Sequence, residues 1–262
     1  MQIPYPRLTG PLILAVLLTI SVVGTAQNFA PGEKLTYDVT WSVFRAGVVT
    51  ATLQDVSSGT HEAYEAIATA KSDGFVSLLM DVDNEFRSLF SPQTLCSQRI
   101  IKKVREGHRH KDSIIVFDSV RKLALLDERD LTLPGAPAKH VENEIPPCVE
   151  DVVGAFYYIR RQHFEVGHNI ELPMNDGSKT VQVVVEVQAR EKVQTPMGTI
   201  DTFRVEPKVF NGLLRRKGRM LIWFSADDQH LPVRIKAVIA VGAITGTLRS
   251  VTHLVPPPPA KP

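Results

Sequence analysis

The sequence predicts a mostly β protein, an antiparallel meander that forms an open or half-closed barrel with one substantial α-helix. Apolar and polar residues alternate over most of the chain, which is the period of a half-buried strand. Turn-forming stretches such as Asn175–Gly177 separate these runs, so consecutive strands can pair antiparallel. The alternation gives way to helical spacing between Cys148 and His163.

The first 26 residues have the three zones of a secretory signal. Arg7 supplies the positive charge, residues 12–23 form an apolar run, and small residues at 24–26 suit a signal peptidase. The alternative, an uncleaved membrane anchor, needs roughly 20 apolar residues to cross the hydrocarbon core. We therefore expect a cleaved signal peptide and an exported protein, periplasmic or secreted.

Residues 27–254 are expected to form a single β-rich domain, followed by a proline-rich tail over 255–262. Prolines cannot donate ladder hydrogen bonds, so the tail is expected to extend as polyproline II. The formal net charge of the chain is +2. This near-neutral balance, in an exported protein, argues against a nucleic-acid partner.

The expected strands share the period-2 alternation. Before the helix they are residues 34–40, 41–53, 61–71, 83–90, 94–105, 108–118 and 122–127; after it they are 170–173, 180–193, 198–209, 219–225, 232–241 and 246–253. Residues 74–80 fit either a short helix or a buried strand. Residues 128–147 are expected to be a loop, because Pro134, Gly135 and Pro137 interrupt them.

The expected helix, residues 148–163, has its apolar residues on one stripe. They are Val149, Val152, Val153, Phe156 and Ile159. Glu150 and Asp151 in the first turn, and Arg160 and Arg161 near the last, would complement the helix dipole. Gly154 costs about 1 kcal/mol in a helix interior relative to Ala, which suggests close packing on the sheet.

Cys96 and Cys148 are the two cysteines of the chain. In an oxidising compartment such a pair predicts a disulfide, worth about 3–4 kcal/mol for a loop of this length. The alternative, a redox-active thiol pair, requires close spacing such as Cys-x-x-Cys, which is not present. We expect a structural disulfide.

Catalytic and metal motifs are weak in this sequence. His108, His110 and Asp112 would share one face of a strand and could bind a transition metal, but their charged run beside a turn favours a solvated face. The pairs Asp81/Asp83 and Asp227/Asp228 are expected to be turn residues, and no G-x-S-x-G elbow occurs. We therefore assign no catalytic residue, metal or cofactor, and leave open an enzyme with dispersed catalytic groups.

Two predicted hairpins are rich in cations. The first holds Arg99, Lys102, Lys103, Arg105, Arg109 and Lys111, and the second holds Arg215, Arg216, Lys217 and Arg219. They could be solvated edges that discourage strand pairing. They could also contact anionic lipid headgroups.

Seven short motifs occur in an order that is similar to one known family. They are residues 29–37, 116–118, 151–160, 167–173, 195–199, 222–227 and 231–234. With these motifs the chain resembles the domain-of-unknown-function 3108 family of bacterial exported proteins, from about residue 29 to 250. The resemblance implies an export context and a β-rich fold, but neither an activity nor catalytic residues.

The function expected from these patterns is binding of an apolar or lipid-like ligand in a curved sheet. Val152, Phe156, Tyr157 and Ile159 are the candidate lining residues, and Arg215 and Arg216 would face headgroups. The alternative is a non-catalytic scaffold or assembly protein whose edge strands or proline tail bind a protein partner. A hydrolase with dispersed catalytic residues is the third hypothesis.

Overall fold

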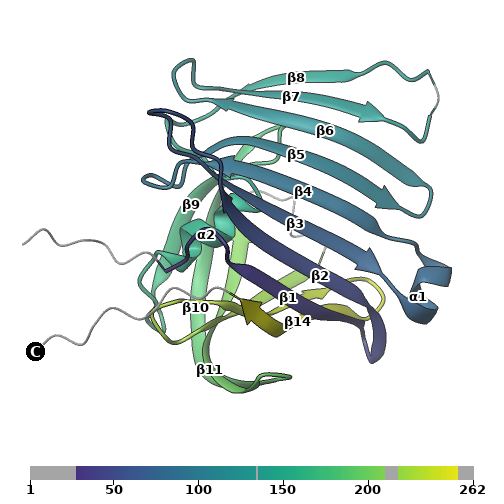
Figure 1. Cartoon of the computed structure of the whole chain (residues 1–262), viewed down its shortest axis with the longest axis vertical. Helices are drawn as coiled ribbons and strands as arrows, with labels where there is room; N and C mark the ends of the chain where they lie inside the picture. Colours follow the sequence, from purple (N-terminus) through teal and green to yellow (C-terminus); the bar gives the residue numbers. More distant parts are fainter. Residues whose placement is uncertain (1–27, 134, 210–217, 253–262) are drawn as a thin grey trace, which may run out of the picture.

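The computed structural model describes residues 28–133, 135–209 and 218–252, and its main feature is one antiparallel sheet of 14 strands (Figure 1). In chain order the strands and helices are β1 (Lys34–Trp41), β2 (Phe44–Asp55), β3 (Tyr64–Ser72), α1 (Gly74–Leu79), β4 (Asp83–Phe90), β5 (Ser97–Glu106), β6 (Arg109–Asp118), β7 (Leu123–Asp130), β8 (Lys139–Glu144), α2 (Gly154–Arg160), β9 (Asn169–Asn175), β10 (Thr180–Thr195), β11 (Gly198–Val209), β12 (Arg219–Ser225), β13 (Pro232–Val238) and β14 (Ala243–Thr252).

The order of strands across the sheet is β8-β7-β6-β5-β4-β3-β2-β1-β14-β13-β12-β11-β10-β9. Strands that are consecutive in sequence therefore lie side by side, except β8 and β9, and β1 pairs antiparallel with β14. This confirms the predicted antiparallel meander.

The sheet curls on itself but does not close within the described residues, because β8 and β9 remain its two edges. Side chains bring these edges together: Asn175 Nδ2 donates to Asn143 Oδ1 at 2.6 Å, and Asn143 Nδ2 donates to the carbonyl of Gly177 at 3.0 Å. The expected open or half-closed barrel is confirmed: the sheet curls but its two edge strands do not pair through their backbones within the described residues.

Helix α2 lies inside the curl and separates two parts of the core (Figure 1). Ala155 and Ile159 pack against the inner faces of β9 to β12, in the largest apolar cluster. Tyr157 packs on the other side against Phe29 and Phe90, with ring centroids 4.9 and 5.2 Å away. The helix therefore fills one end of the barrel.

The predicted helix over 148–163 is longer than α2, which spans Gly154–Arg160. Its expected first turn is extended instead: the amide of Glu150 donates to the carbonyl of Pro173 at 2.9 Å, and the carbonyl of Glu150 accepts from Asn175 at 2.9 Å. Asp151 Oδ1 then accepts the amides of Val153 and Gly154, which begins the helix. Tertiary pairing with β9 thus overrides the local helical pattern.

The predicted loop over 128–147 is wrong in part, because β7 extends to Asp130 and residues Lys139–Glu144 form the edge strand β8. The sequence of β8, KHVENE, is charged because an edge strand exposes its outer face and its free backbone groups. The ambiguous segment 74–80 is resolved as the short helix α1.

Cys96 and Cys148 form a disulfide that ties the β4–β5 turn to the segment before α2. Several predictions fall outside the described residues: the signal peptide over 1–26, Arg215 and Arg216 of the second basic hairpin, and the proline tail over 255–262. Within the described ranges, neither helix has the length and apolar character needed to cross a membrane.

Candidate functional site

The candidate site is a pair of neighbouring apolar cavities on the inner face of β1 to β4. The first, here called the inner cavity, has a volume of about 240 Å³ and lies between α2 and the sheet. Its lining residues include Leu35, Val49, Ala51, Ala68, Phe86, Val152, Phe156, Tyr157 and Ile235.

The second, here called the mouth cavity, has a volume of about 610 Å³ and extends from the same strands to α1. Its lining residues include Val39, Trp41, Gly47, Val49, Ala70, Val76, Leu79, Met80, Val82 and Ile244. Val49 contributes to both cavities, so the two meet on β2. Small-molecule sites are mostly apolar and have volumes of about 300–1,000 Å³, a range that includes the mouth cavity.

The cavities exist because the inner faces of two adjacent strands carry small side chains. Alternate residues of a strand point to one face. On β3 the inward positions include Ala68 and Ala70, which pair directly with Ala51 and Val49 of β2. Gly47 is next along the inner face of β2, where a Cβ atom would overlap the backbone of β3. Small residues at these paired positions leave the space that α2 does not fill.

A buried ion pair lies at the α2 end of the inner cavity. Arg160, 1% exposed, donates from Nη1 and Nη2 to the two carboxylate oxygens of Glu33 at 2.7 and 2.8 Å. Its Nη2 also donates to the carbonyl of Asn28 at 2.9 Å. Burial alone would lower the pKa of Arg160, but its hydrogen bonds to Glu33 outweigh this and raise the pKa. The guanidinium is therefore neutralised within the protein and is not a free binding site for an anionic ligand.

Two adjacent buried carboxyl groups, Glu150 and Asp151, lie just before α2. Asp151 Oδ2 accepts from the Ser88 hydroxyl at 2.6 Å, and the Ser97 hydroxyl lies 3.5 Å from Glu150 Oε2. Burial, and then the neighbouring Asp151 charge, raise the pKa of Glu150 to about 9. Burial also raises the pKa of Asp151. At neutral pH Glu150 is therefore a neutral acid that fits an apolar interior.

The structure brings together three of the four candidate lining residues, of which Val152 lies just before α2 and Phe156 and Tyr157 within it. Val152, Phe156 and Tyr157 line the inner cavity. Ile159 points to the opposite side and is buried in the cluster with β9 to β12. The Glu33–Arg160 pair was not expected, although Arg160 lies four residues after Phe156 and hence on the buried stripe.

The candidate metal residues His108, His110 and Asp112 lie at the β5–β6 hairpin. Asp112 forms an ion pair with Arg105 at 2.7 Å. No group of three metal-ligand side chains occurs in the part of the chain that the structure describes.

Four of the six cations of the β5–β6 hairpin are paired with carboxylates. The pairs are Lys103–Glu85, Arg105–Asp112, Arg109–Glu106 and Lys111–Glu128, with N–O distances between 2.7 and 3.3 Å. An anionic headgroup would have to compete with these carboxylates. Contact between this hairpin and anionic lipid stays a prediction.

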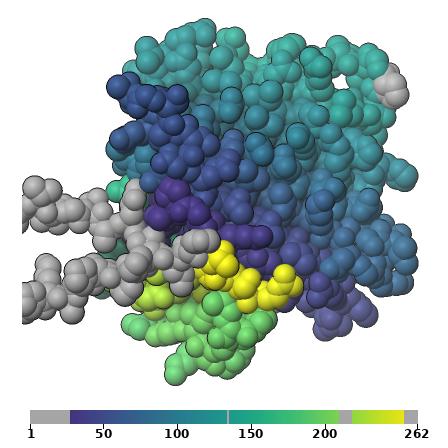
Figure 2. Space-filling model, in the orientation of Figure 1, coloured from purple at the N-terminus to yellow at the C-terminus, as the bar shows by residue number. Residues whose placement is uncertain are grey.

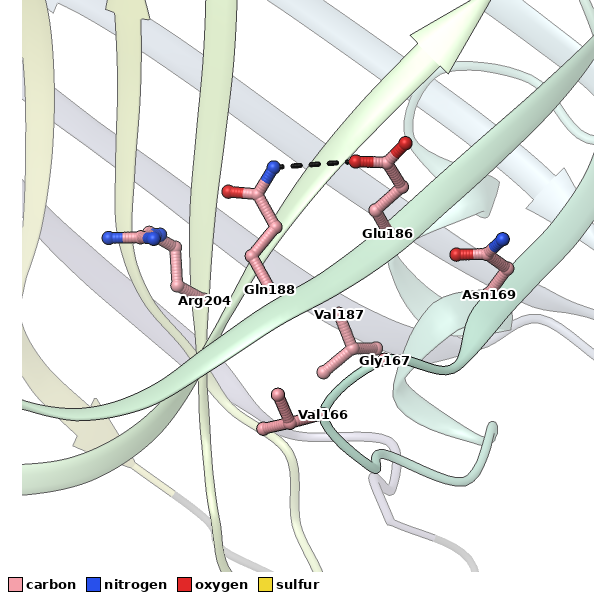
Figure 3. Close-up of a pocket in the computed structure, with 7 residues that line it drawn as sticks. All are labelled: Val166, Gly167, Asn169, Glu186, Val187, Gln188 and Arg204. Atoms are coloured by element: carbon pink, nitrogen blue, oxygen red, sulfur yellow. Dashed lines mark hydrogen bonds between the residues drawn. The ribbon is translucent and has the colours of Figure 1, made fainter.

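A further recess of about 570 Å³ lies against β10 and β11, and Figure 3 shows its lining. Three of its polar side chains are paired with one another or with their neighbours. Gln188 donates to Glu186 at 3.4 Å, Glu186 pairs with Lys208 at 2.6 Å, and Arg204 pairs with Glu191 at 3.2 Å. A ligand in this recess would have to compete with these internal contacts. The two apolar cavities impose no such competition on an apolar ligand.

Comparison with models of known protein families assigns the chain to one of them. The family model described as "Protein of unknown function (DUF3108)" matches residues 36–249. The chain belongs to the DUF3108 family. The resemblance drawn from the seven sequence motifs is thereby confirmed.

A solved structure shares its fold with this DUF3108 chain. A β-barrel-like protein of domain of unknown function DUF1849 from Brucella abortus matches with a TM-score of 0.55 and 9% identity, over 85% of this chain and 98% of its own. At this identity the likeness shows the fold alone.

Two further structures match the DUF3108 chain less well. An inferred exported protein with a YmcC-like fold from Bacteroides fragilis matches with a TM-score of 0.36 and 8% identity, over 86% of this chain and 97% of its own. An inferred lipoprotein from Parabacteroides distasonis matches with a TM-score of 0.31 and 10% identity, over 85% and 96% respectively. Among curated proteins none matches.

Proposed function

We propose that this DUF3108 protein is an exported envelope protein that binds an apolar, lipid-like ligand inside its curled sheet. The observation that supports this most is the pair of cavities that meet at Val49, lined almost entirely by apolar side chains. Apolar surface in contact with water is unfavourable by about 25 cal/mol per Å². A ligand with an apolar chain would relieve this cost along the inner face of β2 from Gly47 to Ala51.

The polar groups near the cavities favour an uncharged or weakly polar ligand body. Arg160 lines the inner cavity but its charge is satisfied by Glu33. At the other end, Asn84, Glu106 and Lys71 border the mouth cavity. A ligand with an apolar chain toward α2 and a polar head toward the mouth fits this distribution.

Export is supported by the sequence and by the disulfide. The N-terminal 26 residues have the zones of a signal peptide. The Cys96–Cys148 disulfide is of the kind that persists in oxidising compartments. A bacterial envelope contains both the compartment and the lipids that the proposal requires.

The proposal is tested by filling the inner cavity without adding charge. Ala51→Phe places a ring in the cavity, whereas Thr52→Phe places the same ring on the outer face of β2, because neighbouring residues point to opposite faces. We expect A51F to weaken binding of a fluorescent long-chain fatty acid about tenfold or more, and T52F to leave it unchanged. Thermal melts of both variants check folding.

A second variant tests the helix side of the same cavity. Phe156→Glu would place a charge against the apolar lining and abolish ligand retention. Gln162→Glu, which adds the same charge just after α2 and outside the cavity lining, is the matched control. Equal binding by wild type, A51F and F156E would refute the assignment of the cavity.

A further inference from the structure

Three turns of the chain meet at one end of the half-barrel, beside the mouth cavity. The β13–β14 turn contacts the β1–β2 turn: the backbone amide of Ser42 donates to the carbonyl of Ala243 at 2.7 Å, and the Trp41 indole donates to the carbonyl of Val241 at 2.9 Å. The start of β2, directly after this turn, contacts the residue before α1: the amide of Asp73 donates to the carbonyl of Ala46 at 3.0 Å. The three segments therefore form one continuous edge.

This edge exposes an unusual number of large apolar side chains. Between 59% and 84% of the surface of each is in contact with solvent; they are Val43, Phe44, Phe75, Leu78, Leu79 and Val241, here called the apolar rim. None of the side chains of α1 is buried and none is charged. Figures 1 and 2 show α1 and the β1–β2 turn projecting at the same corner of the molecule. Contiguous apolar patches of this kind mark interaction surfaces.

The apolar rim and the mouth cavity are parts of one surface. Leu79 belongs to both, and Val76 and Met80 of the same helical segment line the cavity. Trp41 lies at the boundary, with its ring on the cavity and its indole nitrogen hydrogen bonded at the rim. A ligand that leaves an apolar surface held against the rim can therefore reach the cavity without crossing water.

Two ion pairs lie beside the apolar rim. Arg45, at the start of β2, forms a bidentate pair with Asp73, just before α1, with a shortest distance of 2.8 Å. Lys71 pairs with Asp83 at 3.3 Å at the base of α1. Arg45 and Lys71 are thus each paired with a carboxylate, which suits a surface of neutral headgroups over an acyl layer.

We propose that the apolar rim docks on a lipid bilayer, so that the mouth cavity opens directly onto the membrane. This inference rests on the proposed function and deepens it, because it names the bilayer as the place where the ligand is taken up or delivered. Phe44, Phe75 and Leu78 insert at the boundary between headgroups and acyl chains, and Trp41 lies at headgroup level. Apolar insertion rather than ionic attraction drives the contact.

The test is flotation of the full exported protein with phosphatidylcholine vesicles. We expect the wild type to float with the vesicles. The partition coefficient of the variant Phe75→Asp/Leu78→Asp should be at least about tenfold lower, because two apolar side chains no longer insert. Val120→Asp is the matched control, since Val120 is 91% exposed in the β6–β7 turn, away from the rim. We expect V120D to float like the wild type.

Three results would overturn the docking proposal. The first is equal flotation of wild type and F75D/L78D, or no flotation of either. The second is flotation that requires phosphatidylglycerol and disappears in high salt, which would assign the contact to cations instead. The third is a wild-type dimer in sedimentation experiments that F75D/L78D abolishes, with no flotation, which would make the rim a contact between two copies.

Binding of a fluorescent fatty acid in vesicle-free solution separates this proposal from the function on which it rests. F75D/L78D is expected to keep that binding because Phe75 and Leu78 are outside the cavity lining. Fatty-acid binding without flotation would refute docking alone. Flotation that depends on the rim, without fatty-acid binding, would refute the carrier function alone.

Discussion

The substitution Glu150→Gln should make the protein more stable in mild alkali, although it removes a buried carboxyl group. Glu150 is 1% exposed, and burial together with the Asp151 charge raises its pKa to about 9 from an ordinary value of 4.5. Between these two values the folded protein keeps the Glu150 proton, whereas the unfolded chain loses it. Glu150 therefore makes its full contribution to stability below pH 4.5 and loses it progressively as pH rises toward 9.

The magnitude follows from proton linkage. When the folded state holds one proton that the unfolded chain has lost, the unfolding free energy falls by about 1.4 kcal/mol for each unit that the pH rises. Between pH 5 and pH 8 the fall is therefore at most about 4 kcal/mol. Gln is uncharged at every pH and lacks this cost. We expect E150Q to match the wild type within about 1 kcal/mol at pH 5 and to exceed it by about 2–4 kcal/mol at pH 8.

Urea denaturation at pH 5, 6.5 and 8 measures the difference directly. Asp151 is present in both proteins, so its own titration largely cancels. The exposed residue Glu62 supplies a control, since E62Q should follow the wild type at all three values of pH. Equal destabilisation of E150Q at pH 5 and pH 8 would refute the reasoning, because it would mean that Glu150 is ionised and paired in the folded protein.

Three further changes test the structure. Glu33→Gln should lower the unfolding free energy by about 3–5 kcal/mol, since it leaves Arg160 charged, buried and unpaired; an unchanged urea midpoint would contradict this. Reduction of the Cys96–Cys148 disulfide should cost about 2–5 kcal/mol, and equal melts with and without reductant would count against it. Gly47→Ala should cost about 1–3 kcal/mol because its Cβ would overlap the backbone of β3, and a wild-type melting temperature would disprove that close approach.

Most strands could be predicted from the sequence because their alternation coincides with the inner and outer faces of one curled sheet. β4 and β12 begin and end at the predicted residues. β8 was missed because a charged edge strand has little apolar alternation to detect. The length of α2 was overestimated because the backbone of Glu150 pairs with β9, a long-range contact that local periodicity does not record.

The candidate site could be predicted in part. The helical stripe includes Val152 and Phe156, which line the inner cavity together with the candidate lining residue Tyr157. The opposite wall was not predicted, because small residues such as Ala68 and Ala70 satisfy a strand pattern without indicating what space they leave. The apolar rim was missed for a related reason: the sequence of α1 is apolar whether the segment is buried or exposed.

The pairing of β1 with β14 has a consequence for how the chain folds. Lys34 pairs with Thr252, so the first and last described strands meet near the middle of the sheet. Because the chain is synthesised from its N-terminus, β1 to β8 can pair early. One edge of β1 then stays unpaired until β14 has been synthesised. During this interval the exposed strand can recruit another chain. Ile244 of β14 also lines the mouth cavity, so the ligand site is assembled last. Folding of this protein is therefore expected to require that the unpaired edge of β1 is kept from pairing with other chains. Truncation within β14 should cause aggregation as well as loss of ligand binding.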